Sequence, residues 1–237
     1  NLEEITLSSG IKSVGSYAFE DCSALTTVNV AALGDFVSID FENYAANPLS
    51  NTSAQLYVSS DLFSFEGAVT IPDDIKKVGA RAFNSQSEMT SIIVPDSVTS
   101  IGSGAFSGCS GLTSVTIGEG VKSIGEYAFN DCSGLTDVYY QGDLSGWSEI
   151  EFDHEGNIYN LAANPMAYAD NLYINGVLLE GEIVIPEGTE KISAHAFHNC
   201  NVLTSVTIPD SVTSIGRGAF YSCDGLTSVT IPDSVTS

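Results

Sequence analysis

A 23-residue repeat runs through most of the chain. Six Ala-Phe pairs mark it, and the steps from Phe83 to Phe106 to Phe129 and from Phe197 to Phe220 are each 23 residues. Aligned on these pairs, the unit reads C-x-x-L-T-x-V-x-I-P-x-x-V-x-x-I-G-x-x-A-F-x-x. One unit buries about six apolar side chains, at about 1.5–3 kcal/mol each, whereas ordering its backbone costs about 1–2 kcal/mol per residue. A single unit therefore does not fold alone, and the units must stack into a solenoid.

Each unit contains the pattern of two short strands and a tight turn. In "LTSVTI" at 112–117 the apolar residues point inward, while Ser114 and Thr116 point outward. The stretch "SVTSIG" at 97–102 predicts a second short strand, and its glycine turns the chain. The following "GAFSGC" is too short for a regular helix and predicts one helical or 3-10 turn that buries Phe106. The expected fold is mainly β, built from stacked parallel strands.

Two longer intervals in the repeat hold matching inserts. "NYAANPLSNTSAQLYVSSDLFSFEGAVTIP" lies between Phe19 and Phe83, and "IYNLAANPMAYADNLYINGVLLEGEIVIP" lies between Phe129 and Phe197. In the second insert the pair Asn-Gly at 175–176 separates two apolar runs, which predicts a type I′ hairpin. The matching "LYVSSDLF" is a weaker hairpin pattern.

The inserts divide the chain into larger modules. Residues 1–111 form the first module, residues 112–225 form the second, and residues 226–237 begin a further repeat with the same "LTSVTIPDSVTS" that occurs at 203–214. We therefore expect residues 1–237 to be one solenoid that is a fragment of a longer array.

The repeat resembles a known family. The string C-x-x-L-T-S-V-T-I-P-x-S-V-T-S-I-G-x-x-A-F resembles the leucine-rich repeats of BspA-like bacterial surface proteins, and "GWSEIEF" followed by "AANPM" resembles the variant repeats of such proteins. The resemblance implies a curved right-handed solenoid with a parallel sheet on its concave side. It also implies an extracellular location, secreted or at the bacterial cell surface, and a role in adhesion.

The charge balance narrows the range of partners. Thirty acidic and seven basic residues give a formal net charge of −23. Such a surface repels phosphate backbones and anionic lipid, which argues against nucleic acid and membrane-surface binding. The sequence also lacks an apolar run of the about 18–20 residues that a membrane span needs. A partner is expected to be basic or neutral.

Five cysteines occupy one position of the repeat, three residues after the phenylalanine. Cysteines on neighbouring coils, such as Cys109 and Cys132 or Cys200 and Cys223, would lie about 5 Å apart, within the range of a disulfide. Their side chains would nevertheless point the same way, and small buried thiols pack well. We favour a ladder of reduced, packed cysteines, with disulfides and metal binding as alternatives.

Other candidate chemistry has a simpler interpretation in each case. His195, His198 and Cys200 suggest a zinc site, but other units place unrelated residues at the histidine positions, which indicates surface turns. "EIEFDHEGN" at 149–157 could bind Ca²⁺ weakly but lacks the spacing of an EF-hand loop, so a solvated acidic loop is expected. No catalytic signature is present. We expect neither an enzyme nor a cofactor.

The outward positions of the long strands are mostly Ser and Thr, and they change character near the inserts. Apolar or aromatic residues stand outward at a few positions, Tyr57 and Tyr173 lie on the hairpins, and Trp147 either packs inside its insert or stacks on a ligand. Because tyrosine and tryptophan dominate binding hot spots, we expect contacts here. The candidate binding residues are Ile93, Asp137, Tyr139, Trp147, Tyr173 and Val184.

The leading functional hypothesis is a monomeric, non-catalytic adhesion module that binds a host or microbial protein. A structural spacer is the first alternative, since near-identical Ser/Thr units favour a passive role. Carbohydrate binding through the insert aromatics is the second.

Overall fold

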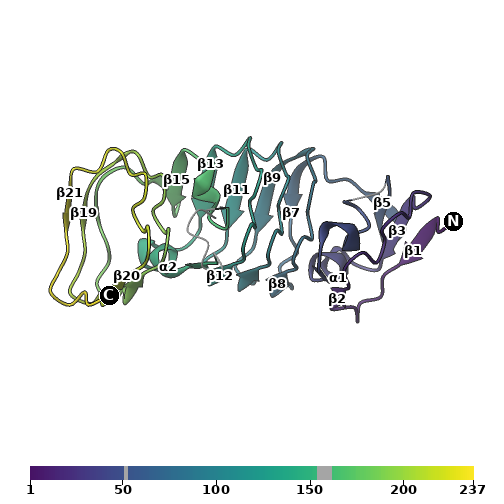
Figure 1. Cartoon of the computed structure of the whole chain (residues 1–237), viewed down its shortest axis with the longest axis horizontal. Coiled ribbons are helices and arrows are strands. Elements are labelled where there is room, and N and C mark those ends of the chain that lie inside the picture. The colour runs from purple at the N-terminus through teal and green to yellow at the C-terminus, as the bar shows by residue number, and fades with distance from the viewer. Residues whose placement is uncertain (51–52, 154–161) are drawn as a thin grey trace.

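Each regular coil of the chain supplies one strand of three to six residues and one strand of two residues, which lie on different faces of the molecule. The computed structural model describes residues 1–50, 53–153 and 162–237. Figure 1 shows the coils stacked side by side along the long axis, with the N-terminus at one end and the yellow C-terminal coils at the other. The predicted leucine-rich-repeat solenoid is confirmed.

The longer strands form three sheets in which neighbours are parallel, apart from one hairpin strand at an edge of each of the first two. The first sheet contains β1 (Glu4–Thr6), β3 (Thr27–Val30), β5 (Gln55–Val58) and β6 (Asp61–Phe63). The second contains β7 (Gly67–Thr70), β9 (Met89–Val94), β11 (Ser114–Ile117), β13 (Asp137–Tyr140), β15 (Asn171–Ile174) and β16 (Val177–Leu178). The third contains β17 (Gly181–Val184), β19 (Leu203–Thr207) and β21 (Ser228–Thr230).

The two-residue strands other than β16 form a second set of parallel ladders. The first ladder pairs β2 (Ser13–Val14) with β4 (Asp40–Phe41). The second is a four-stranded sheet of β8 (Lys77–Val78), β10 (Ser100–Ile101), β12 (Ser123–Ile124) and β14 (Glu151–Phe152). The third pairs β18 (Lys191–Ile192) with β20 (Ser214–Ile215). In the regular coils successive strands pair at the 23-residue step, as Ser100 with Ser123 shows. The repeat length of the sequence is therefore the length of one regular coil.

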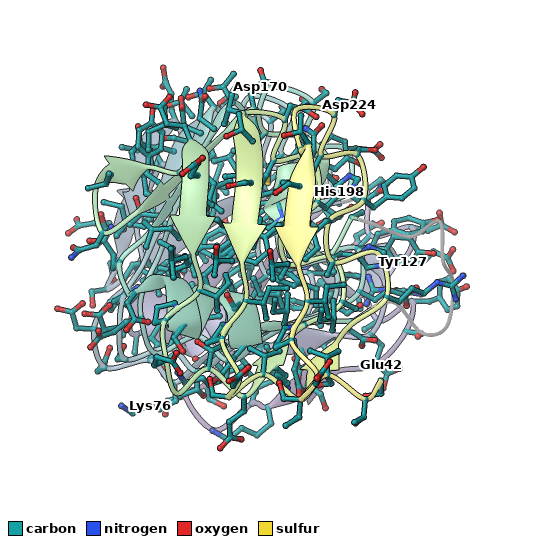
Figure 2. All side chains as sticks on the ribbon, turned by 90° about the vertical axis from the view of Figure 1, so that its left-hand side faces the viewer. Glu42, Lys76, Tyr127, Asp170, His198 and Asp224 are labelled. Atoms are coloured by element: carbon teal, nitrogen blue, oxygen red, sulfur yellow. The ribbon has the colours of Figure 1, made fainter. Side chains whose placement is uncertain are left out.

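One hydrophobic core runs between the two sets of strands. It extends from Leu7 to Ala219 and includes the expected inward positions of each unit, such as Leu112, Val115 and Ile117, all fully buried. Charged side chains stand around the rim, as the labelled Glu42, Asp170 and Asp224 show in the view along the solenoid (Figure 2). The core is continuous across all coils, so each coil depends on its neighbours for burial.

The turn that carries Ala-Phe differs from the expected helical turn. It is a run of tight turns in which Ala105, Ser107 and Cys109 donate backbone hydrogen bonds to residues three positions earlier. Gly104 and Gly108 have φ of 60° and 78°, and left-handed residues of this kind interrupt a helix. Most other units hold non-glycine residues at these two positions.

The turns themselves stack through a regular ladder. The Phe83 amide donates to the Ala105 carbonyl at 2.8 Å, and the Phe106 amide donates to the Ala128 carbonyl at 2.8 Å. The rings of Phe83 and Phe106 stack at 5.4 Å with an interplanar angle of 19°. This ladder buries the repeated phenylalanine and explains why the Ala-Phe pair is the strongest mark of the repeat.

The inserts replace part of a regular coil by helical turns and a hairpin. The first contains α1 (Leu33–Val37) and η1 (Tyr44–Ala46), and the second contains α2 (Leu144–Glu149) and η2 (Pro165–Ala167). Asn175 and Gly176 have φ of 48° and 77°, which confirms the type I′ hairpin. The stretch "LYVSSDLF" of the first insert also forms a hairpin, in which Ser59 and Ser60 adopt φ of 52° and 75°.

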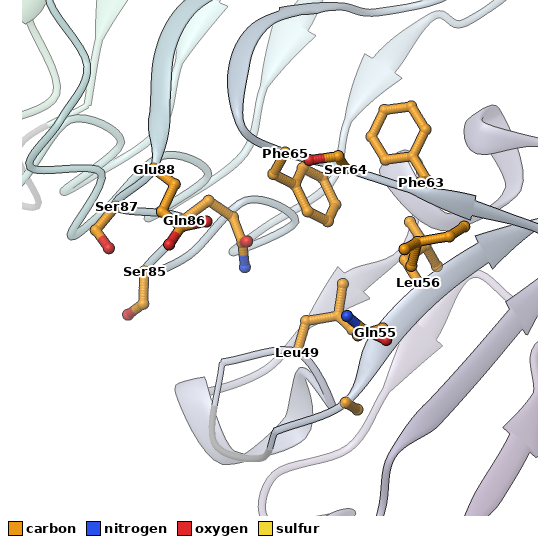
Figure 3. Close-up of a pocket in the computed structure, with 12 residues that line it drawn as sticks. Leu49, Gln55, Leu56, Phe63, Ser64, Phe65, Ser85, Gln86, Ser87 and Glu88 are labelled. Carbon is orange, nitrogen blue, oxygen red and sulfur yellow. The ribbon is translucent and has the colours of Figure 1, made fainter.

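The hairpins interrupt the long-strand face. In each, the returning strand pairs antiparallel with the strand before it, and the next coil starts a new sheet. Around the first interruption Phe65 packs between Phe63 and Phe83 at 5.1 and 5.9 Å. A cavity of about 300 Å³ remains there, and Figure 3 shows Leu49 and the hairpin on one side of it and the turn at 85–88 on the other.

Candidate binding surface

The six-stranded sheet brings several of the candidate residues together. In the parallel register Ile93 lies beside Thr116, Thr116 beside Tyr139, and Tyr139 beside Tyr173. Asp137 lies two residues before Tyr139 on the same strand and faces the same side. We call this group of five outward residues, Ile93, Thr116, Asp137, Tyr139 and Tyr173, the tyrosine face.

The two tyrosines form a stacked pair on the surface. Their ring centroids are 4.6 Å apart and the rings are inclined by 15°. Both side chains are half-buried, and Ile93 is 41% exposed. Partial burial, followed by the nearby Asp137 and Tyr173, raises the pKa of the Tyr139 phenol, so this hydroxyl stays protonated at neutral pH. The pair offers a rigid aromatic surface that loses little side-chain entropy when it makes contact.

Asp137 is the only charged residue among the two rows of outward residues in this sheet, all of whose strands the structure describes. Its carboxylate accepts a hydrogen bond from Asn171 Nδ2 at 3.0 Å and one from Thr136 Oγ1 at 2.8 Å. These two donors hold the carboxylate in place beside the tyrosines. An ordered negative charge next to aromatic rings is suited to a cation.

A hollow of about 580 Å³ opens at the carboxyl ends of the same strands. It is lined by Asp96, Glu119 and Asp143, and we call it the acidic hollow. Beneath it lies the buried Tyr140, whose phenol pKa rises to about 12 because of burial and then the charges of Asp143, Glu119, Asp96 and Glu149. The hollow carries three carboxylates against one exposed ammonium group, that of Lys122, so negative charge is in excess around it.

Trp147 does not belong to this surface, which corrects its place among the candidates. Its side chain is fully buried, and its indole Nε1 donates a 2.8 Å hydrogen bond to the Ala196 carbonyl. It packs against Tyr140 and Phe152 with ring centroids 5.6 and 5.7 Å away. The insert needs a large side chain to fill its own core, so the packing alternative holds.

Val184 is exposed but lies on a different sheet. It is 68% exposed and pairs with Thr207 on β19, beyond the hairpin that ends the six-stranded sheet. The sequence reasoning placed it in one strip with Tyr139 because it treated the outward positions as continuous. The hairpin breaks that continuity.

Asn171 and the acidic hollow were missed as parts of the surface. Thr116 was predicted to point outward but was not chosen as a binding residue, because threonine also suits a strand. The acidic residues of the hollow were visible in the sequence as an acid that follows each strand, in "VPD" at 94–96, "IGEG" at 117–120 and "GD" at 142–143. They line one hollow only where the second insert meets the regular coils.

The cysteines are free thiols in the structure, in line with the favoured alternative. The thiols of Cys109, Cys132 and Cys223 each donate to the phenylalanine carbonyl of the preceding coil, at 3.0–3.2 Å. Burial raises the pKa of Cys109, Cys132 and Cys200, which keeps these thiols protonated and unreactive. Cysteine therefore takes part in the ladder that joins successive turns.

The expectation of surface histidines is wrong. His195 is 5% exposed and His198 is 6% exposed, and the His198 ring stacks on Tyr221 with centroids 5.4 Å apart. Burial, followed by the neighbouring His195, lowers the pKa of His198 to about 4, so it is neutral at pH 7. Both side chains pack inside the turn stack.

Within residues 1–50, 53–153 and 162–237, no group of three or more His, Cys, Asp or Glu side chains is placed to hold a metal ion. The suggested Ca²⁺ loop at 149–157 lies partly outside these residues, at 154–157. No helix in the same ranges is long and apolar enough to cross a membrane.

The chain belongs to the family of BspA-type leucine-rich repeats. Six copies of the family's repeat region match residues 1–60, 60–165 and 170–237, which is nearly the whole chain. The assignment agrees with the coil geometry, since each regular copy contributes one strand to each face. A search of curated proteins gave no match.

Several solved structures share the repeat architecture. A leucine-rich repeat protein of T. pallidum is 22% identical, with 71% of each chain covered and a TM-score of 0.41. A leucine-rich cell surface protein of Faecalibacterium prausnitzii is 23% identical (99% of this chain, 62% of that one, TM-score 0.44). A leucine-rich repeat protein of Bacteroides ovatus is 24% identical (96% and 54%, TM-score 0.43). The chain thus spans about half to seven tenths of the length of these proteins.

Proposed function

We propose that this chain is a non-catalytic protein-binding module of a bacterial surface protein, and that the tyrosine face is its contact surface. The observation that carries the proposal is the stacked pair Tyr139 and Tyr173 on a sheet face made otherwise mostly of Ser, Thr and Ala. A solenoid needs inward residues for stability, whereas its outward strand positions need only suit a strand. Two outward tyrosines in register, held beside an ordered carboxylate, therefore favour recognition over architecture.

Membership of the BspA-type family supports the surface location and the role in adhesion that the proposal includes. Extended sheet faces are also the surfaces that repeat proteins commonly use for binding. Among the described residues no group of three or more His, Cys, Asp or Glu side chains is placed to hold a metal ion, and the proposal needs none.

The experiment is a screen of the purified chain against immobilised extracellular-matrix and bacterial surface proteins, followed by affinity measurement on each positive. The informative variant is the double substitution Tyr139→Ser and Tyr173→Ser. Tyr57→Ser is the matched control, since Tyr57 occupies the position of Tyr173 in the first hairpin. We expect the double variant to lose binding and the control to keep it; equal binding by all three proteins would refute the site.

A structural spacer is the second candidate function. The outward residues of the third sheet support it, because Ser205 pairs with Ser228 and Thr207 with Thr230 in a repetitive face without aromatic residues. Under this alternative the screen gives no partner, and removing whole coils from the parent protein shortens its reach without changing any interaction.

A further inference from the structure

The register of the six-stranded sheet leaves a slot on the tyrosine face. Ile93 and Tyr139 flank Thr116 on the two neighbouring strands. Strands in a sheet are about 4.8 Å apart, so the two large side chains stand about 10 Å apart with only a threonine between them. One ring face of Tyr139 is covered by Tyr173, and the other is turned toward this slot. The slot is wide enough for one flat group or one extended side chain.

Negative charge lies at both ends of the slot. Asp137 is at one end, with its carboxylate oriented by Asn171 and Thr136. The acidic hollow is at the other, because Asp96 and Glu119 each follow three residues after Ile93 and Thr116 along their strands. Three residues of extended chain cover about 10 Å, which is within the reach of one bound peptide. The chain as a whole carries a net charge of −23, so long-range attraction acts in the same direction.

We infer that the tyrosine face binds an extended, basic protein segment, with one arginine side chain in the slot against Tyr139 and a second basic side chain in the acidic hollow. The inference rests on the proposed function and names the chemistry of its partner. The guanidinium of arginine is flat, stacks on aromatic faces and pairs with a carboxylate, so it uses Tyr139 and Asp137 together. Lysine uses the charge but not the flat stacking surface.

The same geometry disfavours other ligands. A phosphate or an acidic peptide would be repelled by Asp137 and by the acidic hollow. A neutral sugar could stack on a tyrosine, but it would not use the negative charge at either end of the slot. The two ligand classes therefore differ in their dependence on salt and on Asp137.

The test uses two synthetic peptides, acetyl-GSRTRSG-amide and the same peptide with citrulline in place of both arginines. Citrulline keeps the shape of the side chain and removes its charge. Binding to the whole chain is followed by NMR through the aromatic resonances of the tyrosines, at low and at physiological salt. We expect the arginine peptide to shift the Tyr139 and Tyr173 signals, the citrulline peptide to bind at least about fivefold more weakly, and salt to weaken binding.

Variants locate the contacts. Asp137→Asn keeps the size of the side chain and is expected to weaken the arginine peptide about threefold, and Tyr139→Ser about tenfold, whereas the control Tyr57→Ser has no effect. Glu119→Gln with Asp143→Asn tests the acidic hollow, and asparagine still caps α2 at position 143. These substitutions should lower the affinity for the arginine peptide and leave the affinity for the citrulline peptide unchanged.

The outcomes separate this inference from the proposed function. Equal affinity for the two peptides, or no effect of Asp137→Asn on the affinity for the arginine peptide, overturns the inference. Binding of the chain to a glycan array also overturns it, if that binding does not depend on salt and Tyr139→Ser abolishes it. If a protein partner from the screen still depends on Tyr139 and Tyr173 in that case, the proposed function stands and only the basic partner is refuted.

Discussion

Replacing Trp147 by phenylalanine should destabilise the second insert by more than the small loss of side-chain volume alone predicts. The indole Nε1 is the donor to the buried Ala196 carbonyl, at 2.8 Å. In regular coils the equivalent carbonyl accepts a main-chain bond, as Ala105 does from Phe83. The first insert has Phe36 in place of the tryptophan, and there Asn47 Nδ2 reaches the equivalent Ala82 carbonyl at 3.3 Å. The matching Asn164 of the second insert bonds to the His195 carbonyl instead.

The expected magnitude follows from two contributions. Leaving a buried carbonyl without its donor costs about 1–3 kcal/mol. Removing about 40 Å³ of side-chain volume adds about 1 kcal/mol, at about 24 cal/mol per Å³ of cavity. The free energy of unfolding should therefore fall by about 2–4 kcal/mol. The control is Phe36→Leu, which trims a fully buried ring at the matching position of the first insert without removing a hydrogen bond.

The assay is urea denaturation followed by far-ultraviolet circular dichroism, since Trp147 is the only tryptophan and its fluorescence is lost in the variant. Hydrogen exchange measured by mass spectrometry over residues 193–200 localises the effect. We expect Trp147→Phe to cost clearly more than Phe36→Leu and to speed exchange in that segment. Equal losses in the two variants, with unchanged exchange, would show that the indole hydrogen bond does not hold the junction together.

Three further predictions use local features of the coils. Ser60→Gly should stabilise the first hairpin by up to about 1 kcal/mol, because φ is 75° there; an unchanged thermal midpoint would contradict this. Ellman's reagent at pH 8 should label the half-buried Cys22 well before Cys132, whose pKa burial raises to about 12; equal labelling rates would argue against the buried ladder. Burial lowers the pKa of His198 from 6.5 to about 4, so the unfolded chain binds more protons in this window. Stability should therefore fall as the pH drops from 6.5 toward 4, and less steeply in His198→Asn, as urea midpoints across this range would show.

The period, the inward positions and one hairpin were readable from the sequence. The Ala-Phe spacing of 23 residues equals one coil, because each coil must present the same apolar residues to the same core. The pair Asn175-Gly176 specified its turn because few other residues accept two left-handed conformations in succession. Ser59 and Ser60 adopt the same turn without such residues, which only the paired strands around them explain.

Only the tertiary structure decided which residues of different coils contact each other. Tyr139 and Tyr173 are 34 residues apart and touch because the second insert returns the chain to the next position of the sheet. The same insert buries Trp147, and the coil that follows buries His195 and His198. Hydrophobic periodicity specifies which way a residue points within its own coil. What it meets there depends on the coil stacked beside it, and an insert of irregular length changes that neighbour without changing the local pattern.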